Sequence, residues 1–296
     1  MSATVAVDAS ATGDAKFILT LRCPDQPGIV HAVSGFLLRH GGNILASAQF
    51  GDPETGGFFM RVHFSVRDCP LDASGLTRLF AEIGEPFAMT WDLFSAEAPY
   101  RTLIMVSRHG HCLNDLLFRW STGALHIEIP AIVSNHRDFE RLASSYDIPF
   151  HHIPVTPESK VQAESRFFEL VDGLDIHLVV LARYMQVLSD EACRRLSGRA
   201  INIHHSFLPS FKGARPYHQA HNRGVKLIGA TAHYVTGDLD EGPIIEQDVA
   251  RVDHTMTPEE LVTTGREVES RALSQAVRWH SEQRVLLNGS KTIVFP

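Results

Sequence analysis

The sequence predicts an α/β fold in two parts, a compact βαββαβ unit followed by a larger, mostly parallel α/β domain. Three observations support this prediction. At 296 residues, the chain has the length of two typical domains. Strand and helix patterns follow one another in the order βαββαβ up to residue 95. From residue 101 onward, near-continuous apolar runs alternate with amphipathic stretches, which is typical of parallel strands covered on both faces.

The first domain is predicted to span residues 16–95, after a small and polar segment, residues 1–15, that we expect to be a flexible tail. Ile29 and Val33 recur at helical spacing, and Gly41 is suited to the left-handed conformation that ends many helices. Alternating apolar patterns bounded by turn residues predict the strands. We expect strands over 17–23, 43–50, 57–66 and 87–94, and helices over 29–38 and 76–83.

The second domain is predicted to span residues 101–296, after a linker at 96–100. A long helix is expected near its end, because Thr257, Pro258 and Glu260 have the spacing of a capping box with a first-turn proline. The apolar runs that predict the parallel strands are 102–107, 127–135, 150–155, 176–182 and 200–206.

The composition favours small-molecule partners over large charged ones. Hydrophobic residues make up 44% of the chain, charged residues make up 21%, and the net charge is −7. Such a chain has no general attraction to nucleic acid or to an anionic membrane. The first residues lack the pattern of a signal peptide, and no apolar run approaches the ~20 residues that span a bilayer. We therefore expect a cytoplasmic protein.

Neither the cysteines nor the histidines predict a metal centre. The four cysteines, Cys23, Cys69, Cys112 and Cys193, are scattered without CxxC spacing, and we expect mostly buried thiols. Several of the 17 histidines occur in close pairs, but no pair matches HExxH or supplies the ligand set of a zinc site. The prediction is that the protein binds no metal.

Three hydrogen-bonding side chains, Asn202, His204 and His205, occur where a predicted parallel strand ends. In α/β sheets, ligands bind beyond the carboxyl ends of the strands. Side chains two residues apart on a strand share a face, so Asn202 and His204 are expected to project together. By the same alternation, His205 faces the opposite side unless the strand has already ended. This leaves open whether His205 acts in catalysis or bonds within the loop.

A second polar stretch follows an apolar strand that contains His233. The loop after this strand carries Asp238, Asp240 and Glu241. Because charged side chains are rarely buried without partners, either these acids are solvated or one of them is held against a partner. His233 itself is either a satisfied core histidine or a residue close to the same site.

These motifs resemble those of a known family. An Asn-x-His motif at a strand end, a Leu-Pro turn soon after it and a downstream Asp-x-Gly loop occur in this order within residues 201–249. The order resembles that of the folate-dependent formyltransferase-fold enzymes, and most closely the formyltetrahydrofolate deformylases. The segment Pro24–Val30, in its βαββαβ context, is similar to an ACT domain. The resemblances imply a ferredoxin-like ACT domain followed by a Rossmann-like, mostly parallel formyltransferase-fold domain.

The resemblance implies a catalytic trio of Asn202, His204 and Asp240. Attack on the formyl carbon of an N-aryl formamide creates an oxyanion, to which the Asn202 amide and a protonated His204 would donate hydrogen bonds. Asp240 would accept a proton from water and relay a proton to the leaving nitrogen. His205 and His233 are further candidates for catalysis or for positioning water. The residues implied to bind the folate are Arg183, Met185, Gln186, Val187, Leu188 and Gly237.

The acceptor of the formyl group does not follow from the catalytic trio, because the family contains transferases as well as hydrolases. The glycinamide ribonucleotide formyltransferases, which this domain also resembles, have a glycine-rich phosphate loop after their first strand. Here residues 107–117 contain Gly110 alone, which is a poor match to a phosphate cradle. His205 also stands where those transferases usually have proline.

Water is therefore the implied acceptor, and the implied reaction is hydrolysis of 10-formyltetrahydrofolate to tetrahydrofolate and formate. This reaction would supply formate to purine synthesis and balance the folate pools. Folate is then substrate and product, with no retained cofactor. A formyltransferase with an amine acceptor and a non-catalytic folate or amino-acid sensor are the alternatives.

The resemblance to an ACT domain implies a small-molecule effector. ACT domains often bind an amino acid between a helix start and a strand of a partner subunit, which makes Asp25, Gln26, Gly28 and Asn43 candidate ligands. Glycine or methionine would suit the regulation of one-carbon metabolism. We expect a homo-oligomer that binds small molecules and neither nucleic acid nor membrane.

Overall fold

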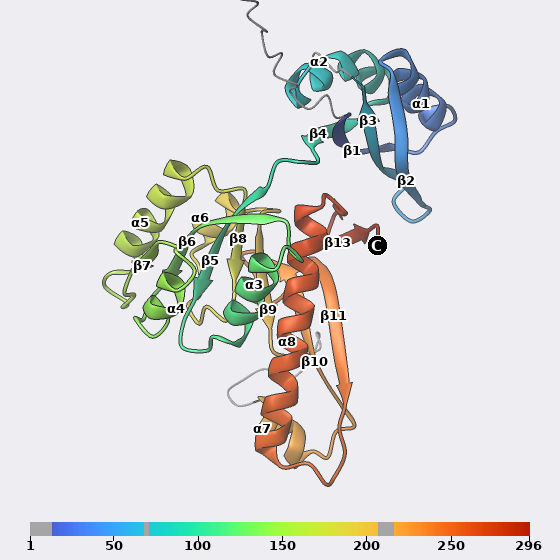
Figure 1. The fold of residues 1–296 in the computed structure, drawn as a ribbon. Helices are drawn as coiled ribbons and strands as arrows, with labels where there is room; N and C mark the ends of the chain where they lie inside the picture. Colours follow the sequence, from blue (N-terminus) through green and yellow to red (C-terminus); the bar gives the residue numbers. More distant parts are fainter. Residues whose placement is uncertain (1–13, 68–70, 207–215) are drawn as a thin grey trace, which may run out of the picture. The chain divides into compact units, whose positions relative to one another are not determined.

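The computed structural model describes residues 14–67, 71–206 and 216–296. The chain divides into two compact units, of which the first ends at Ala98 and the second begins at Pro99 (Figure 1).

Some sequence-based predictions fall on residues outside these ranges. The predicted tail, residues 1–15, lies outside them except for its last two residues, and the first strand already begins at Ala15. Cys69 and the predicted turn at Leu208 and Pro209 also lie outside the described residues. The other cysteines are buried free thiols, namely Cys23, Cys112 and Cys193.

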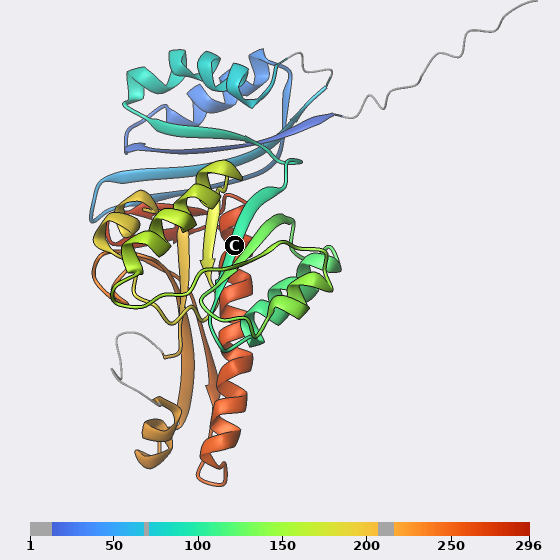
Figure 2. The same ribbon diagram turned by 90° about the vertical axis from the view of Figure 1, so that its left-hand side faces the viewer.

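The first unit has the predicted βαββαβ order. Its strands form one antiparallel sheet in the order β2-β3-β1-β4. Figures 1 and 2 show both helices on the same face of this sheet. The elements are β1 Ala15–Pro24, α1 Ile29–Arg39, β2 Gly42–Asp52, β3 Gly57–Val66, α2 Ala73–Gly84, the 3-10 turn η1 Glu85–Phe87 and β4 Thr90–Ser95.

The core of this unit lies between the sheet and its two helices. Ile29, Val33 and Phe36 form the buried face of α1, as their helical spacing predicts. The second helix begins where the Asp72 side chain accepts a hydrogen bond from the Gly75 N–H at 2.7 Å. The apolar spacing therefore accounts for the orientation of α1, and the Asp72 N-cap accounts for the start of α2.

The second unit is built on a seven-stranded sheet in the order β11-β10-β9-β8-β5-β6-β7. The strands from β9 to β7 run parallel, whereas β10 pairs antiparallel with both β9 and β11. The predicted mostly parallel sheet is thus confirmed, with an antiparallel edge added. The strands are β5 Tyr100–Val106, β6 Ile127–Ser134, β7 Phe150–His152, β8 Leu178–Leu181, β9 Ala200–His204, β10 Leu227–Tyr234 and β11 Ile244–Arg251, and a separate hairpin pairs β12 Val285–Asn288 with β13 Lys291–Val294.

Helices cover both faces of this sheet. Leu113 of α3, Ala143 of α4 and Leu273 of α8 belong to the core on one face, and Phe167 of α5 and Ala192 of α6 belong to the core on the other. Among the helices that the structure describes, none combines the length and the apolar character needed to cross a membrane. The helices are α3 His111–Ser121, α4 Glu140–Ser144, α5 Lys160–Gly173, α6 Asp190–Arg195, α7 Pro216–Asn222 and α8 Pro258–Ser281.

The longest helix, α8, begins with the predicted capping box. The Thr257 hydroxyl accepts a hydrogen bond from the Glu260 N–H at 3.2 Å, and the Glu260 carboxylate accepts one from the Thr257 N–H at 2.7 Å. The helix runs for 24 residues and packs against α3, α7, β9, β10 and β11. Side chains of α8 therefore lie along the edge strands of the sheet, from β11 to β9.

Candidate active site

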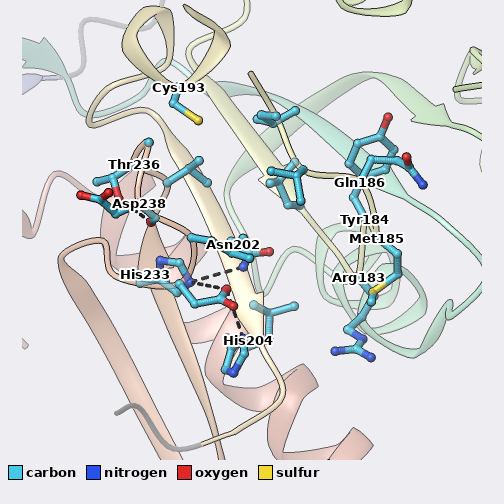
Figure 3. Close-up of a pocket in the computed structure, with 18 of the residues that line it drawn as sticks. Arg183, Tyr184, Met185, Gln186, Cys193, Asn202, His204, His233, Thr236 and Asp238 are labelled. Carbon is cyan, nitrogen blue, oxygen red and sulfur yellow. Dashed lines mark hydrogen bonds and ion pairs between the residues drawn. The ribbon is translucent and has the colours of Figure 1, made fainter. Parts of the chain in front are cut away.

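A pocket of about 220 Å³ lies beyond the ends of β8 and β9, beside the loop that follows β10 (Figure 3). In α/β sheets this is the place where ligands bind. Figure 3 shows Arg183 to Gln186 on one side of the pocket, and Asn202, His204 and His233 on the other. All the site residues predicted in this unit line it, namely Arg183, Met185, Gln186, Val187, Leu188, Asn202, His204, His205, His233, Gly237 and Asp240.

Asn202 and His233 face each other across neighbouring antiparallel strands. They are direct partners in the register of β9 and β10, so their side chains share one face of the sheet. His233 Nδ1 lies 2.9 Å from the Tyr234 carbonyl oxygen, which only accepts hydrogen bonds, so Nδ1 carries a proton. The Asn202 amide nitrogen, which only donates, lies 3.3 Å from His233 Nε2, so Nε2 accepts this hydrogen bond. His233 is both buried in its strand and part of the site.

Asp240 lies between two histidines of the pocket. Its Oδ1 is 3.1 Å from His204 Nδ1 and 3.7 Å from His233 Nε2. Its backbone has φ of 60°, a left-handed conformation that aspartate adopts more readily than most residues other than glycine. The sequence left open whether the acids of this loop are solvated or held against partners. Asp240 is held against partners.

The charge of Asp240 is set by these contacts. The hydrogen bond from His204, with a smaller contribution from the nearby His233, holds the pKa of the Asp240 carboxyl well below its usual range. The carboxylate is thus an anion near neutral pH, and it favours a proton on His204 Nδ1. In the described part of the chain, His204 Nε2 has no hydrogen-bond partner. The ring is therefore held at one nitrogen only.

His205 lies just past the end of β9, so the alternation of side chains along the strand does not apply to it. Its ring stacks on that of His204, with centroids 4.8 Å apart and planes at 25°. His205 Nδ1 lies 2.9 Å from Arg183 Nη1. Burial and the neighbouring Arg183 charge lower the pKa of His205 to about 4. His205 is therefore a neutral side chain of the pocket wall at neutral pH.

The predicted folate segment lies in the loop between β8 and α6. Its backbone is anchored by the Met185 N–H, which donates to Ser107 Oγ at 2.9 Å, while Ser107 donates to Asn135 at 2.7 Å. Met185 is 54% exposed and Val187 is 60% exposed, although both are apolar. They form an apolar lip on the pocket, which suits the flat face of an aromatic ring.

Several residues that line the pocket were not predicted from the sequence. Leu239 is 63% exposed, and an apolar side chain inside an acidic loop is the signal that could have identified it. Tyr184 lies between two predicted contacts and could have been included on that ground. The lining residues that were not predicted are Leu181, Tyr184, Cys193, Ile203, Val235, Thr236, Asp238 and Leu239.

The four candidate effector ligands lie in the first unit. Asp25, Gln26 and Gly28 are exposed in the connection between β1 and α1, and Asn43 is exposed on β2. Gly28 has φ of 98° at the N-cap of α1, a conformation that favours glycine and explains this residue without a ligand. Their role in binding an effector stays a prediction.

Comparison with known proteins agrees with this arrangement. Residues 100–277 match the formyl transferase family, and residues 17–70 match the ACT domain family. The formyltetrahydrofolate deformylase of Corynebacterium sp. (strain P-1) is 52% identical over 279 residues, which is 94% of this chain and 98% of that protein. The formyltetrahydrofolate deformylase of Bacillus subtilis (strain 168) is 49% identical over 278 residues, which is 94% of this chain and 93% of that protein.

Solved structures give the same result. The crystal structure of formyltetrahydrofolate deformylase from Burkholderia mallei ATCC 23344 has a TM-score of 0.91 and 52% identity, and the match covers 95% of this chain and 100% of that one. A phosphoribosylglycinamide formyltransferase from Coxiella burnetii has a TM-score of 0.62 and 31% identity, and the match covers 67% of this chain and 94% of that one. With both of its parts matched, the chain belongs to the formyltetrahydrofolate deformylase family.

Proposed function

We propose that this chain hydrolyses 10-formyltetrahydrofolate to tetrahydrofolate and formate. The observation that carries the proposal is the continuous set of contacts from Asn202 through His233 and Asp240 to His204 on one wall of the pocket. This wall places an amide donor, an imidazole and a carboxylate around a single bound formyl group. Membership of the deformylase family supports the same reaction.

The amide of Asn202 and the ring of His204 are proposed to stabilise the oxyanion. When water attacks the formyl carbon, the carbonyl oxygen becomes negative and needs donors that are already in place. The strand β9 presents both side chains on one face, and His233 holds the Asn202 amide at 3.3 Å. Asp240 holds His204 at Nδ1, so a protonated His204 donates from Nε2. The donors therefore need little reorganisation as the charge develops.

Asp240 is proposed to move the proton. Both of its contacts use Oδ1, so Oδ2 is the oxygen that takes a proton from the attacking water. As the bond between the water oxygen and the formyl carbon forms, this proton passes to Asp240 and then to N10 of the folate. The bond between the formyl carbon and N10 breaks as N10 is protonated. Formic acid then loses its proton to solvent, which balances the reaction.

The folate itself is proposed to rest on the loop between β8 and α6. The apolar lip of Met185 and Val187 provides a surface for the pterin ring, and backbone groups of residues 184–188 provide hydrogen bonds. Folate enters as substrate and leaves as product, so the chemistry uses no retained cofactor. The formate released would serve purine synthesis.

One assay tests this proposal. Purified full-length protein is incubated with 10-formyltetrahydrofolate in the absence of any amine, and formate is quantified. We expect formate and tetrahydrofolate in equal amounts, and their release should depend on Asn202 and Asp240. Formate at the background level would contradict the proposal.

A second arm of the assay addresses formyl transfer. Glycinamide ribonucleotide is added, and its formylated product is sought by mass spectrometry. We expect neither formylation of the amine nor faster consumption of 10-formyltetrahydrofolate. Formylated product that appears in place of formate would make the chain a transferase.

The first unit is proposed to bind a small-molecule effector, with an amino acid such as glycine or methionine as the candidate. The match of residues 17–70 to the ACT domain family supports this proposal. Calorimetric titration of the full chain with each amino acid, combined with the formate assay, provides the test. The absence of both binding heat and any change in rate would contradict an effector role for that amino acid.

A further inference from the structure

Glu269 is a buried carboxylate in α8 that lies behind the pocket and does not line it. It is 1% exposed. Its Oε2 lies 2.7 Å from His111 Nε2, at the start of α3, and its Oε1 lies 2.6 Å from the Tyr217 hydroxyl of α7. Arg183, in the loop after β8, places Nε 3.4 Å from Oε2 as an ion pair. Three separate elements thus converge on one buried acid.

These partners keep Glu269 ionised. Burial by itself would raise the pKa of this carboxyl, but the hydrogen bonds from His111 and Tyr217 and the charge of Arg183 outweigh burial, and the pKa is lowered. His111, Cys112 and Glu269 also have their ligand atoms within 4.8 Å of one another. Burial raises the pKa of the Cys112 thiol, however, and the positive Arg183 already pairs with the carboxylate. Glu269 thus has two hydrogen-bond partners and one positively charged neighbour, Arg183.

The same guanidinium determines the tautomer of His205. Arg183 Nη1 lies 2.9 Å from His205 Nδ1. A guanidinium has only donors and stays protonated in proteins, so His205 Nδ1 must accept this hydrogen bond. The proton of the neutral ring is then on Nε2. Arg183 is held in an uncommon left-handed backbone conformation, with φ of 62°, which is unfavourable for a residue with a Cβ.

We propose that Glu269 and Arg183 are positioning residues that fix His205 as a neutral imidazole with its proton on Nε2, and that this N–H holds the attacking water. The inference rests on the proposed hydrolysis. The water accepts a hydrogen bond from His205 on one lone pair, directs the other lone pair at the formyl carbon and gives a proton to Asp240. His205 is then a hydrogen-bond donor, and Asp240 is the base.

The groups around His205 agree with a neutral ring. They are Arg183 after β8, His204 on β9, Asp240 after β10 and Glu269 on α8. Burial, Arg183 and His204 lower the pKa of His205 to about 4, and the two carboxylates oppose this shift only in part. Between mildly acidic and mildly alkaline pH the ring therefore carries a single proton, whose position Arg183 decides.

The tautomer is measured directly by 15N NMR of the full chain with labelled histidine. Protonated and unprotonated ring nitrogens have different chemical shifts, and the signals of His205 are those missing from a His205→Gln variant. We expect a protonated Nε2 and an unprotonated Nδ1 from about pH 5.5 to about pH 8. A proton on Nδ1 overturns the proposal whether or not the protein releases formate, so this result is distinct from a failure of the deformylase assignment.

The pH dependence of an Arg183→Met variant tests the positioning role. Without the guanidinium the proton exchanges between the two ring nitrogens, and the pKa of His205 rises above about 4, although burial, the larger cause of the shift, still lowers it. We expect the ratio of variant kcat to wild-type kcat to be lowest near pH 8 and to rise toward about pH 5.5, because the growing fraction of imidazolium always carries a proton on Nε2. A ratio that does not change with pH overturns the proposal.

A matched pair of variants tests the donor itself. His205→Gln can place an N–H close to the position of Nε2, whereas His205→Leu offers no donor. We expect kcat within about tenfold of wild type for the first and a loss of about 100-fold for the second, with KM little changed. Equal kcat values for the two folded variants overturn the proposal. Should Arg183→Met not fold, this pair and the NMR of the wild-type protein still decide the question.

Discussion

The rings of His204 and His205 stack with centroids 4.8 Å apart, yet their Nδ1 atoms face opposite charges. His204 Nδ1 lies 3.1 Å from the Asp240 carboxylate, and His205 Nδ1 lies 2.9 Å from the Arg183 guanidinium. The carboxylate favours a proton on the first Nδ1, and the guanidinium requires a lone pair on the second. Two adjacent residues of the same type thus obtain different chemistry from the loops beside them.

Replacement of Asp240 by asparagine should abolish most of the activity. Asparagine tolerates the φ of 60° found here, but it neither takes a proton from water nor carries the charge that holds His204. We expect kcat for formate release to fall by ~10²–10⁴-fold. Asp248→Asn is the matched control, because Asp248 pairs with Arg271 on the edge of the sheet and does not line the pocket. Activity of Asp240→Asn equal to that of the control would rule out the proposed role of Asp240.

Replacement of Asn202 by alanine should remove one donor from the developing oxyanion. The loss is expected in kcat, by ~10²–10³-fold, with KM little changed, because the donor acts on charge that exists only in the transition state. Steady-state kinetics with 10-formyltetrahydrofolate separates the two constants. The Asn202→Asp variant keeps the size of the side chain but has no amide donor, so we expect it to be as slow as the alanine variant. A change confined to KM would place Asn202 in substrate binding instead.

The strand end that carries the site could be predicted from the sequence because its signals are local. Alternation along β9 places Asn202 and His204 on one face, and the polar residues stand where the apolar run stops. The capping box at Thr257 and Glu260 is local in the same way, and the structure contains it. Such features depend on residues a few positions apart, so a single sequence displays them.

The partners of these residues could not be predicted, because they depend on long-range packing. His233 meets Asn202 only because β10 returns antiparallel to β9, and an apolar strand does not reveal its direction. Glu269 stands in an amphipathic helix, where a glutamate is usually solvated. Its burial is decided by His111 and Tyr217, which lie more than 50 positions away in the chain.

Substitution of Gly242 by alanine should damage both stability and activity. A Cβ at this position would lie 1.7 Å from the Tyr234 carbonyl oxygen, which accepts the hydrogen bond from His233 Nδ1. The loop that carries Asp240 must then move, and we expect the free energy of unfolding to fall by about 1–3 kcal/mol or more. The control is Gly173→Ala at the end of α5, where a Cβ meets nothing within 4 Å. Chemical denaturation measures both variants, and equal stability would contradict the close approach at Gly242.

His280 links stability to pH. It lies on α8, where its Nδ1 is 2.7 Å from the Tyr234 hydroxyl. Burial raises the pKa of Tyr234, so the hydroxyl keeps its proton and donates a hydrogen bond to His280. Burial also lowers the pKa of His280 from 6.5 to about 4. The folded state therefore holds a neutral imidazole over a pH range in which the unfolded chain binds a proton.

The folded protein should consequently lose stability as the pH falls from 6.5 to about 4, because in this window the unfolded state takes up a proton that folded His280 does not. Above pH 6.5 the stabilising contribution of neutral His280 is fully present. As the pH falls through this window, the free energy of unfolding decreases by about 3 kcal/mol. His280→Gln keeps an acceptor for the Tyr234 hydroxyl but does not titrate, so the difference in unfolding free energy between variant and wild type should change by this amount from pH 7 to pH 4. Because His205 is present in both proteins, its own titration cancels in the difference. Urea denaturation at several pH values measures it, and parallel curves for the two proteins would show that His280 is protonated in the folded state as readily as in the unfolded chain.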